Sequence, residues 1–540
     1  MRRESALVAL VGLVVYGSLC PPASGMGDSS EFALVLATNG VAHPTGYPLY
    51  TLFGHFFSVA VHALGVSWPL AAGLWSVLGG AVALYFLHAL GMELAAGVSG
   101  ASSTTRSLAT LVPLALFAFQ PVVREEATHA EVNIWSFAWA CGAAYAFVRM
   151  GHAIRVDPAP RHGRLRAAQW GLVVGLGLAH HLTSILVSVP LSAGLIATLA
   201  WRRQFSPRLL AVGVAAALVP IASYGITAWH AWHPARVQWE WLEPSVAGVV
   251  AHITGDQYRQ FVGYFAPSPS QKELLTRAVY PFLLPGLALL LLGVLRARGE
   301  RRIAWAALLA AAALVTVFTF RYGVPDPAPY FLPALALGVA AAAPAVAAIP
   351  GAGSRTGTAI LGSAGLAGLF LIVPWLHEGS EERAATMEFE KTIRSMWAAI
   401  PPDTALVSWT DDRFTRLVEY QVLRGEKPAL LIFTPDLLYA PPMRRRIRER
   451  FGADPLEGFD TPHLPARATA GEKVIIDESR RRLVASLNER IRVPVILFDP
   501  AVPIVWQMKK PWEAAGDPGP GLLPSTDHRV HPTARSAIGR

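Results

Sequence analysis

Residues 279–295 read VYPFLLPGLALLLLGVL and carry no charged side chain. A helix of about 20 apolar residues is long enough to cross the roughly 30 Å hydrocarbon core of a bilayer. Similar runs recur as far as residue 376. Their apolar residues are continuous, instead of recurring at every third or fourth position as in an amphipathic helix. This pattern favours membrane spans over the core of a soluble protein. The sequence therefore predicts a polytopic integral membrane protein.

The overall composition agrees with this interpretation. Of the 540 residues, 53% are hydrophobic and only 15% are charged, and the mean hydropathy is +0.39. Soluble domains carry about 25% charged residues. The net charge of +9 would suit a nucleic-acid partner, but the arginines lie in short clusters between the apolar runs, as the positive-inside rule requires of a membrane protein. We therefore expect the lipid bilayer, and no nucleic acid, as a partner.

The apolar stretches predict an all-α membrane region with about eleven transmembrane helices. They are Ser5–Cys20, Pro69–Leu94, Leu108–Val123, Ile134–Met150, Trp170–Ser184, Ile185–Trp201, Leu209–Trp229, Val279–Leu295, Ile303–Phe320, Tyr330–Ile349 and Ile360–Leu376. The first of these could also be a signal peptide, because Arg2 and Arg3 precede it, but no clean cleavage site follows. We expect an uncleaved helix.

Loop charges predict the orientation, because basic residues gather on the cytoplasmic side. Alternate loops carry the arginine clusters, which places the N-terminus in the cytoplasm and the C-terminal region outside. The segment 21–68 then forms a long first outer loop. Its stretch Tyr47–Val66 is expected to form helices lying at the membrane interface, since an extra span would invert every later loop.

After Leu376 the hydropathy falls. Strand-like runs at 405–409, 428–433, 473–477 and 493–499 alternate with helical patterns at 413–425 and 477–491. Such alternation predicts a small α/β domain with a partly parallel sheet. The expected organisation is a transmembrane domain at 1–376, a soluble extracytoplasmic α/β domain at 377–513 and a disordered tail at 514–540.

Cysteine use excludes a thiolate metal site. Cys20 and Cys141 are the only cysteines, and both are expected to be buried and unpaired. Asp411 and Asp412 are interpreted as a helix N-cap rather than a metal pair. No cluster with metal-ligand spacing is visible, so we expect neither a metal nor another cofactor, and a divalent metal ion stays open as the alternative.

Polar residues gather in four segments on the predicted outer side, joined by His180 and His181. The segments are GDSSEF with HPTGYPLY (27–32 and 43–50), REEATHAEVN (124–133), HITGDQYRQF (252–261) and RYGVPDPAPYF (321–331). Ionisable residues beside membrane spans are costly and mark candidate functional sites. Solvent-exposed outer loops also carry charged residues. Each cluster taken alone could therefore be an ordinary solvated loop without a function.

Asp28 and Glu31 suit one reaction class in particular. A sugar linked to a lipid phosphate already has an activated anomeric carbon, so the protein needs a carboxylate to take the acceptor's proton and a cation to hold the phosphate charge. Asp28 is the expected general base, and Glu31, otherwise a helix N-terminal charge, is the alternative. The expected cation is Arg259, Arg321 or Arg124.

At these residues the sequence resembles a known family. GDSSEF…NGVAHPTGYPLYTLFG resembles the signature of membrane proteins related to protein O-mannosyltransferases, in the GT-C glycosyltransferase superfamily. Weaker similarities follow in the same order at 128–137, 175–183, 252–261, 325–333 and 408–433. The sequence departs from the family pattern at Asn133, where tyrosine is common, and at Thr410 and Asp412, where glycine and asparagine are.

This resemblance implies a GT-C-like helical fold. The implied activity transfers a sugar, mannose-like by family, from a polyprenyl-phosphate donor to an acceptor hydroxyl on the outer face, with the catalytic aspartate in the first outer loop. The acceptor, whether a protein, a lipid or a glycan, remains open. The composition, rich in Ala, Gly, Arg and Pro, suits a bacterial protein, so the expected location is an inner or plasma membrane. The further candidate substrate-binding residues are His43, Tyr47, Glu131, Asn133, His181, Tyr258, Arg259, Arg321, Asp326 and Tyr330.

Two other functions fit the same sequence. One is a flippase for lipid-linked glycans, and the other is a scaffold that binds partners through its outer domain. Transporters tend to contain repeated halves and charges near the bilayer midplane. We find no internal repeat, and the charges lie near the membrane surface, which favours the enzyme.

Overall fold

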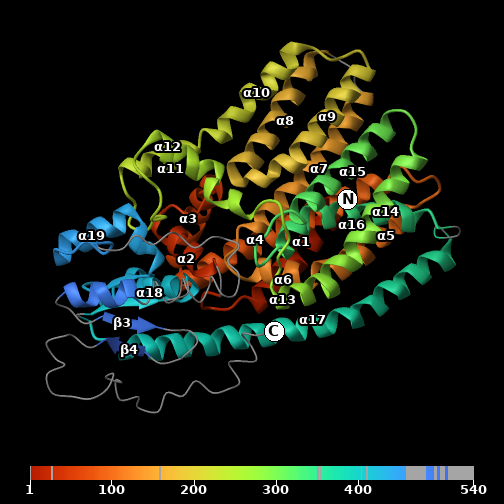
Figure 1. Cartoon of the computed structure of the whole chain (residues 1–540). Helices are drawn as coiled ribbons and strands as arrows, with labels where there is room; N and C mark the ends of the chain where they lie inside the picture. The colour runs from red at the N-terminus through yellow and green to blue at the C-terminus, as the bar shows by residue number, and fades with distance from the viewer. Residues whose placement is uncertain are drawn as a thin grey trace.

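The computed structural model describes residues 2–25, 28–156, 160–349, 352, 354–402, 404–408, 411–457, 482–491, 495–498 and 505–508. Most of this part of the chain is helical (Figure 1). The longer helices are α1 (Arg2–Leu19), α4 (Trp68–Ala95), α5 (Ser103–Ala118), α7 (Asn133–Val156), α8 (Pro160–His180), α9 (Ile185–Trp201), α10 (Pro207–Ile221), α14 (Tyr280–Arg296), α15 (Glu300–Thr319), α16 (Leu332–Ala347) and α17 (Arg355–Ala399).

Each predicted apolar stretch overlaps one of these helices or a bent pair, although the stretch at 170–184 continues past the end of α8 at His180. Among the described residues, six helices are long and apolar enough to cross a membrane, or up to eight if each bent pair is one span. The bent pairs are α5 with α6 (Pro121–Thr128), at 71°, and α10 with α11 (Tyr224–Trp232), at 40°. The chain is thus a multi-pass membrane protein, while the count of eleven spans stays a prediction.

The first outer loop contains two short helices instead of a span. These are α2 (Ser29–Thr38) and α3 (Pro48–His62). Most of α2 is buried, whereas α3 exposes Phe53, Phe56 and Val59 along one side. An apolar face on a short surface helix is typical of helices that lie in the membrane interface.

Further short helices lie in the later loops of the bundle and in the C-terminal region. They are η1 (Leu182–Ser184), α12 (Val246–Thr254), η2 (Asp256–Phe261), α13 (Pro269–Leu274), η3 (Leu275–Val279), η4 (Ala328–Phe331), η5 (Asp436–Tyr439) and α19 (Pro441–Phe451). Three of them, η1, η2 and η4, carry candidate site residues or adjoin them.

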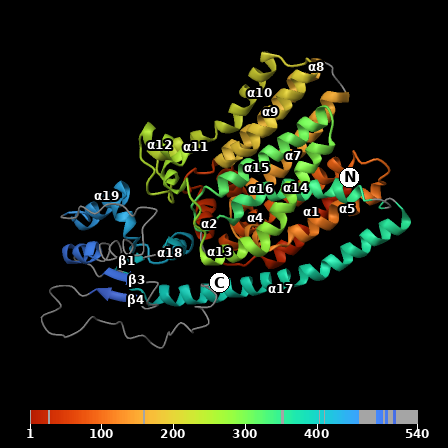
Figure 2. The same cartoon turned by 45° about the vertical axis from the view of Figure 1, so that its right-hand side comes forward.

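Helix α17 continues through the predicted domain boundary at residue 376. It is 45 residues long and runs beside the bundle toward the C-terminal strands in both views (Figures 1 and 2). The fall in hydropathy at 376 therefore does not end a helix. The change in hydropathy marks only a change in the surroundings of α17, because the backbone hydrogen bonds of a helix form whether its side chains face lipid or water.

The C-terminal region contains a four-stranded sheet in the order β2-β1-β3-β4. Its strands are β1 (Ala405–Ser408), β2 (Leu431–Phe433), β3 (Val495–Phe498) and β4 (Val505–Met508). Strand β1 pairs in parallel with β2 and β3, and β4 is antiparallel to β3. Three strands lie within predicted runs and β4 was not predicted, while the run at 473–477 and the tail at 514–540 fall outside the described residues.

The C-terminal region contacts the first outer loop directly. Helix α18 (Asp411–Arg424) packs against α2. The Ser24 hydroxyl donates a hydrogen bond to Glu419 Oε2 at 2.7 Å, and the hydroxyls of Ser30 and Thr415 lie 2.5 Å apart. Helix α18 therefore holds the chain on either side of Asp28 in the sequence.

Both cysteines are buried and free, as predicted.

Candidate active site

The two predicted carboxylates open helix α2. Asp28 occupies the N-cap position, and Glu31 lies in the first turn. Acidic side chains at these positions interact favourably with the positive end of the helix dipole. Their surroundings differ, because the Asp28 side chain is 57% exposed and the Glu31 side chain is 14% exposed. Asp28 is thus the more accessible of the two to a substrate.

His43 links these carboxylates. Its backbone N–H donates to Glu31 Oε1 at 2.6 Å, and its Nδ1 lies 3.0 Å from Glu31 Oε2. On its other side, Nε2 lies 3.0 Å from the Tyr47 hydroxyl and 3.7 Å from Asp28 Oδ2. Both oxygens of Glu31 therefore hold the histidine, which favours a positioning role for Glu31 over a role as the base.

The electrostatic setting of His43 holds a proton on it. Burial lowers the pKa of this imidazole, but the nearby carboxylates of Glu31 and Asp28 raise it further, to about 9. His43 is therefore an imidazolium at neutral pH. Its positive charge partly offsets the two carboxylates, which would otherwise repel each other across a few ångströms.

This pKa predicts a pH dependence of stability. Because the folded-state pKa lies above the ordinary value of about 6.5, proton binding stabilises the fold, and the contribution is complete below pH 6.5. It is lost as the pH rises to about 9 and amounts to about 3 kcal/mol. We expect the melting temperature of the purified protein to fall across this window, and to fall less in His43→Gln. Identical pH profiles for the two proteins would contradict the assignment.

Aromatic rings from distant segments surround this cluster. The ring centroids of Tyr47 and His181 are 5.3 Å apart, and those of His181 and Tyr330 are 6.3 Å apart. The ring centroid of His43 lies 6.3 Å from that of Tyr258 and 6.1 Å from that of Trp239. Rings of this kind form an apolar wall with polar tips, which suits a sugar or a phosphate at the mouth of a site. Four of the predicted residues thus meet around His43.

A loop contact brings in two residues that sequence reasoning missed. Val41 forms an isolated bridge with Gln238, which places the neighbouring Trp239 against His43. Gly46 has φ +79°, and a Cβ there would lie 3.0 Å from His252 Nε2. Burial, followed by the charge of His43, lowers the pKa of His252 to about 4, so this imidazole is neutral.

Further carboxylates lie around the same space. Burial raises the pKa of Glu131 well above its ordinary value, and the charges of Glu126, Asp28 and Asp326 raise it further. A protonated Glu131 can donate a hydrogen bond to a sugar oxygen. Asn133 lies beside Glu126. Glu126 was not predicted as a site residue, although it belongs to a segment that the sequence singled out.

The three candidate cations have different partners. Arg124 is fully buried and bonds Glu382 and the Trp375 carbonyl of α17, so it is not available to a phosphate. Arg259 is exposed and pairs with Asp256 at 2.9 Å. Arg321 is exposed and forms no ion pair within the described part of the chain. It adjoins Tyr322, whose ring lies 5.2 Å from Tyr330.

One group of side chains has a geometry that could hold a metal ion. The ligand atoms of Asp28, Glu31 and His43 lie within 4.8 Å of one another. A histidine binds a metal through a neutral imidazole nitrogen. Here both oxygens of Glu31 are already bonded to His43, one to its backbone N–H and one to its ring. These residues therefore fit a resident metal poorly.

Comparison with known proteins agrees with the motifs. Residues 28–204 match the family described as Protein O-mannosyl-transferase TMEM260 N-terminal domain. The curated protein O-mannosyl-transferase tmem260 of Dictyostelium discoideum is 34% identical over 77 residues, which cover 14% of this chain and 9% of that protein. The match thus spans about a tenth of the relative's length. The predicted resemblance to protein O-mannosyltransferases is confirmed for this part of the chain.

Two solved structures share the fold over most of the chain. One is ArnT from Cupriavidus metallidurans bound to undecaprenyl phosphate, with a TM-score of 0.51 and 14% identity, covering 80% of this chain and 89% of that one. The other is the Archaeoglobus fulgidus oligosaccharyltransferase tethered with an acceptor peptide, with a TM-score of 0.52 and 13% identity, covering 91% and 68%. Both are GT-C glycosyltransferases, so the fold is of the GT-C type.

Proposed function

We propose that the chain is a glycosyltransferase that moves a sugar from a polyprenyl-phosphate donor to an acceptor hydroxyl, with Asp28 as the general base. The observation that carries this proposal is the position of Asp28. Its carboxylate is accessible, opens α2 and lies within 3.7 Å of the protonated His43, inside a wall of tyrosine rings. The family match begins at this residue, and the GT-C neighbours support the same class of reaction.

In the proposed reaction, the acceptor hydroxyl gives its proton to the Asp28 carboxylate as its oxygen attacks the anomeric carbon of the donor. The bond between that carbon and the phosphate oxygen breaks, and polyprenyl phosphate leaves with the bonding electrons. Positive groups near the leaving phosphate stabilise the charge that develops on it. Tyr258, Tyr330 and His181 line the space in which the sugar would lie.

Arg321 is the cation that we assign to the leaving phosphate, because among the described residues it is exposed near Tyr330 and has no carboxylate partner. Arg321→Gln should lower kcat/KM for the donor by about 10- to 100-fold, as expected for a lost hydrogen bond to a charged group. Arg445→Gln, an exposed arginine on α19, is the matched control and should keep normal turnover. Equal kcat/KM for both variants would contradict the role of Arg321.

We further propose that the reaction needs no metal, because both oxygens of Glu31 are already bonded to His43. Turnover should be unchanged when the protein is treated with EDTA and assayed in metal-free buffer. The measurement is the initial rate before and after chelation. A loss of activity that Mn²⁺ or Mg²⁺ restores would instead assign Asp28, Glu31 and His43 to a metal site.

The proposed orientation places Asp28 on the extracytoplasmic face of a cell inner or plasma membrane. It rests on the alternation of arginine clusters, which favours a cytoplasmic N-terminus. The C-terminal region then lies on the same side as Asp28, consistent with the contacts of α18 with α2. An acceptor protein, lipid or glycan would approach from that side.

The experiment that tests the function uses purified protein in nanodiscs and a panel of polyprenyl-phosphate sugars. Transfer of sugar from one donor, or slow hydrolysis of that donor without acceptor, is the expected result. The same preparation is assayed for movement of labelled lipid-linked sugar between leaflets. Leaflet exchange without any release of polyprenyl phosphate would favour a flippase over the proposed enzyme.

A further inference from the structure

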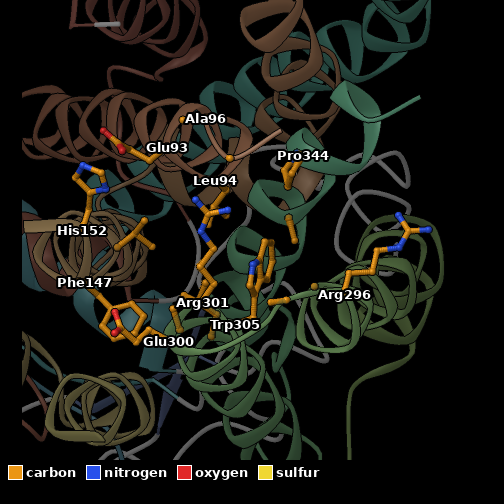
Figure 3. A pocket seen from close by; sticks show the side chains of 18 of the residues that line it. Glu93, Leu94, Ala96, Phe147, His152, Arg296, Glu300, Arg301, Trp305 and Pro344 are labelled. Carbon is orange, nitrogen blue, oxygen red and sulfur yellow. The ribbon is translucent and has the colours of Figure 1, made fainter. Parts of the chain in front are cut away.

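A cavity of about 480 Å³ lies at the end of the bundle opposite Asp28. Helix α4 connects the two ends, because Ser76 bonds the backbone of Glu131 beside the candidate active site and Glu93 lines the cavity. The residues between them span roughly 25 Å along a helix axis. The cavity is bounded by α4, α7, α9, α14, α15 and α16 (Figure 3).

The cavity has an apolar wall and a basic rim. The wall includes Leu94, Phe147, Leu289, Leu292, Trp305 and Leu308, and the rim carries His152, Arg155, Arg296 and Arg301. Figure 3 shows the Arg301 and Trp305 side chains rising from the same helix, α15, with Arg296 and His152 on opposite sides. The site is therefore amphipathic, with positive charge where the membrane-crossing helices end.

The two carboxylates that line the cavity are already paired. Glu93 accepts from Arg149 at 2.9 Å, and Glu300 pairs with Arg202. Within the described ranges, no carboxylate pairs with Arg155, Arg296 or Arg301. Burial, followed by the positive charge of Arg301, lowers the pKa of Arg155, so these guanidinium groups oppose one another. An anion between them would relieve that repulsion.

We propose that this cavity binds the phosphate headgroup of an anionic membrane phospholipid, with part of one acyl chain against the apolar wall. Guanidinium groups match phosphate oxygens with paired donors, and basic pockets between transmembrane helices bind acidic headgroups. A lipid is favoured over a free anion because Leu291 and Leu295, on the same helix as Arg296, are exposed. The apolar wall thus continues into surface that the bilayer covers.

The proposal does not depend on the reaction at the other end of the chain. A ligand that binds only the folded state stabilises it by mass action. A lipid held by residues of α7, α14 and α15 should therefore raise the melting temperature without being required for the chemistry at Asp28. Lipid binding and sugar transfer can fail separately.

The test titrates the purified full chain, in neutral detergent, with phosphatidylglycerol, phosphatidylcholine or inorganic phosphate. Native mass spectrometry counts the bound lipid, and the melting temperature reports stability. We expect phosphatidylglycerol to be retained and to stabilise the protein, with phosphatidylcholine and phosphate having little effect. The double variant Arg155→Gln/Arg301→Gln should bind phosphatidylglycerol about 25-fold more weakly, at about fivefold for each charge removed.

The matched control is Arg298→Gln/Arg302→Gln, which removes two neighbouring exposed charges outside the cavity lining and should keep the affinity. Gly97→Leu supplies a second variant that keeps every charge. The nearest atom to a Cβ there is Arg301 Nη1 at 3.7 Å, so leucine can enter the cavity and should displace the lipid. Equal loss in the control pair, no preference over phosphatidylcholine, or saturation by inorganic phosphate alone would each overturn the proposal.

Discussion

Asp28→Asn should lower the turnover number of the purified protein by about 10²- to 10⁴-fold, the contribution expected of a general base. The amide keeps the size of the side chain but cannot take the acceptor's proton. Because the Asp28 side chain is 57% exposed, its replacement should leave the melting temperature near that of the native protein. The measurement is transfer from the donor that the nanodisc panel identifies, at saturating donor and acceptor.

Two further carboxylate variants make this result specific. Glu388→Gln removes an exposed carboxylate on α17, paired with Lys391 at 3.1 Å, and should leave turnover unchanged. Glu31→Gln should lower the melting temperature as well as turnover, since Glu31 holds both the backbone and the ring of His43. Native-like turnover in Asp28→Asn would reject Asp28 as the base while leaving the enzyme class intact.

Arg124→Met should destabilise the protein by about 2–3 kcal/mol, because it removes the fully buried member of an ion pair whose other member, Glu382, is 37% exposed. The Arg124 side chain is fully buried, bonds both oxygens of Glu382 and the Trp375 carbonyl, and lies 3.7 Å from Glu378. The variant leaves Glu382 without its cation and the Trp375 carbonyl without this donor, while Glu378 keeps its pair with Arg277. The expected readout is a large fall in melting temperature at neutral pH.

The matched control for this prediction is Arg277→Gln. Arg277 pairs with the same Glu378 but is 46% exposed, so its loss should cost at most about 1 kcal/mol. A second check comes from Gly379 on α17, where a Cβ would lie 2.7 Å from Arg124 Cδ. Gly379→Val should therefore disturb the same contact. Equal small effects for Arg124→Met and Arg277→Gln would show that α17 is held by other contacts.

Sequence alone identified the features that depend on local chemistry. The apolar stretch at 279–295 predicts a span because the transfer free energy of a helix depends mainly on its own side chains. The motifs around Asp28 and His43 predicted the family resemblance, which is confirmed for residues 28–204. Strands at 405–408, 431–433 and 495–498 also lie within predicted runs.

The partners of charged groups were decided by the tertiary structure. Arg124 was a candidate phosphate ligand by sequence, but its ion pair joins it to Glu382, 258 residues away. Trp239 meets His43 only because a loop folds back onto Val41. Hydropathy is a property of each segment, whereas the pairing of buried charges depends on which segments pack together, and no local pattern encodes that. Sequence therefore determined the membrane fold class and the residue types of the site, and packing decided which of them meet.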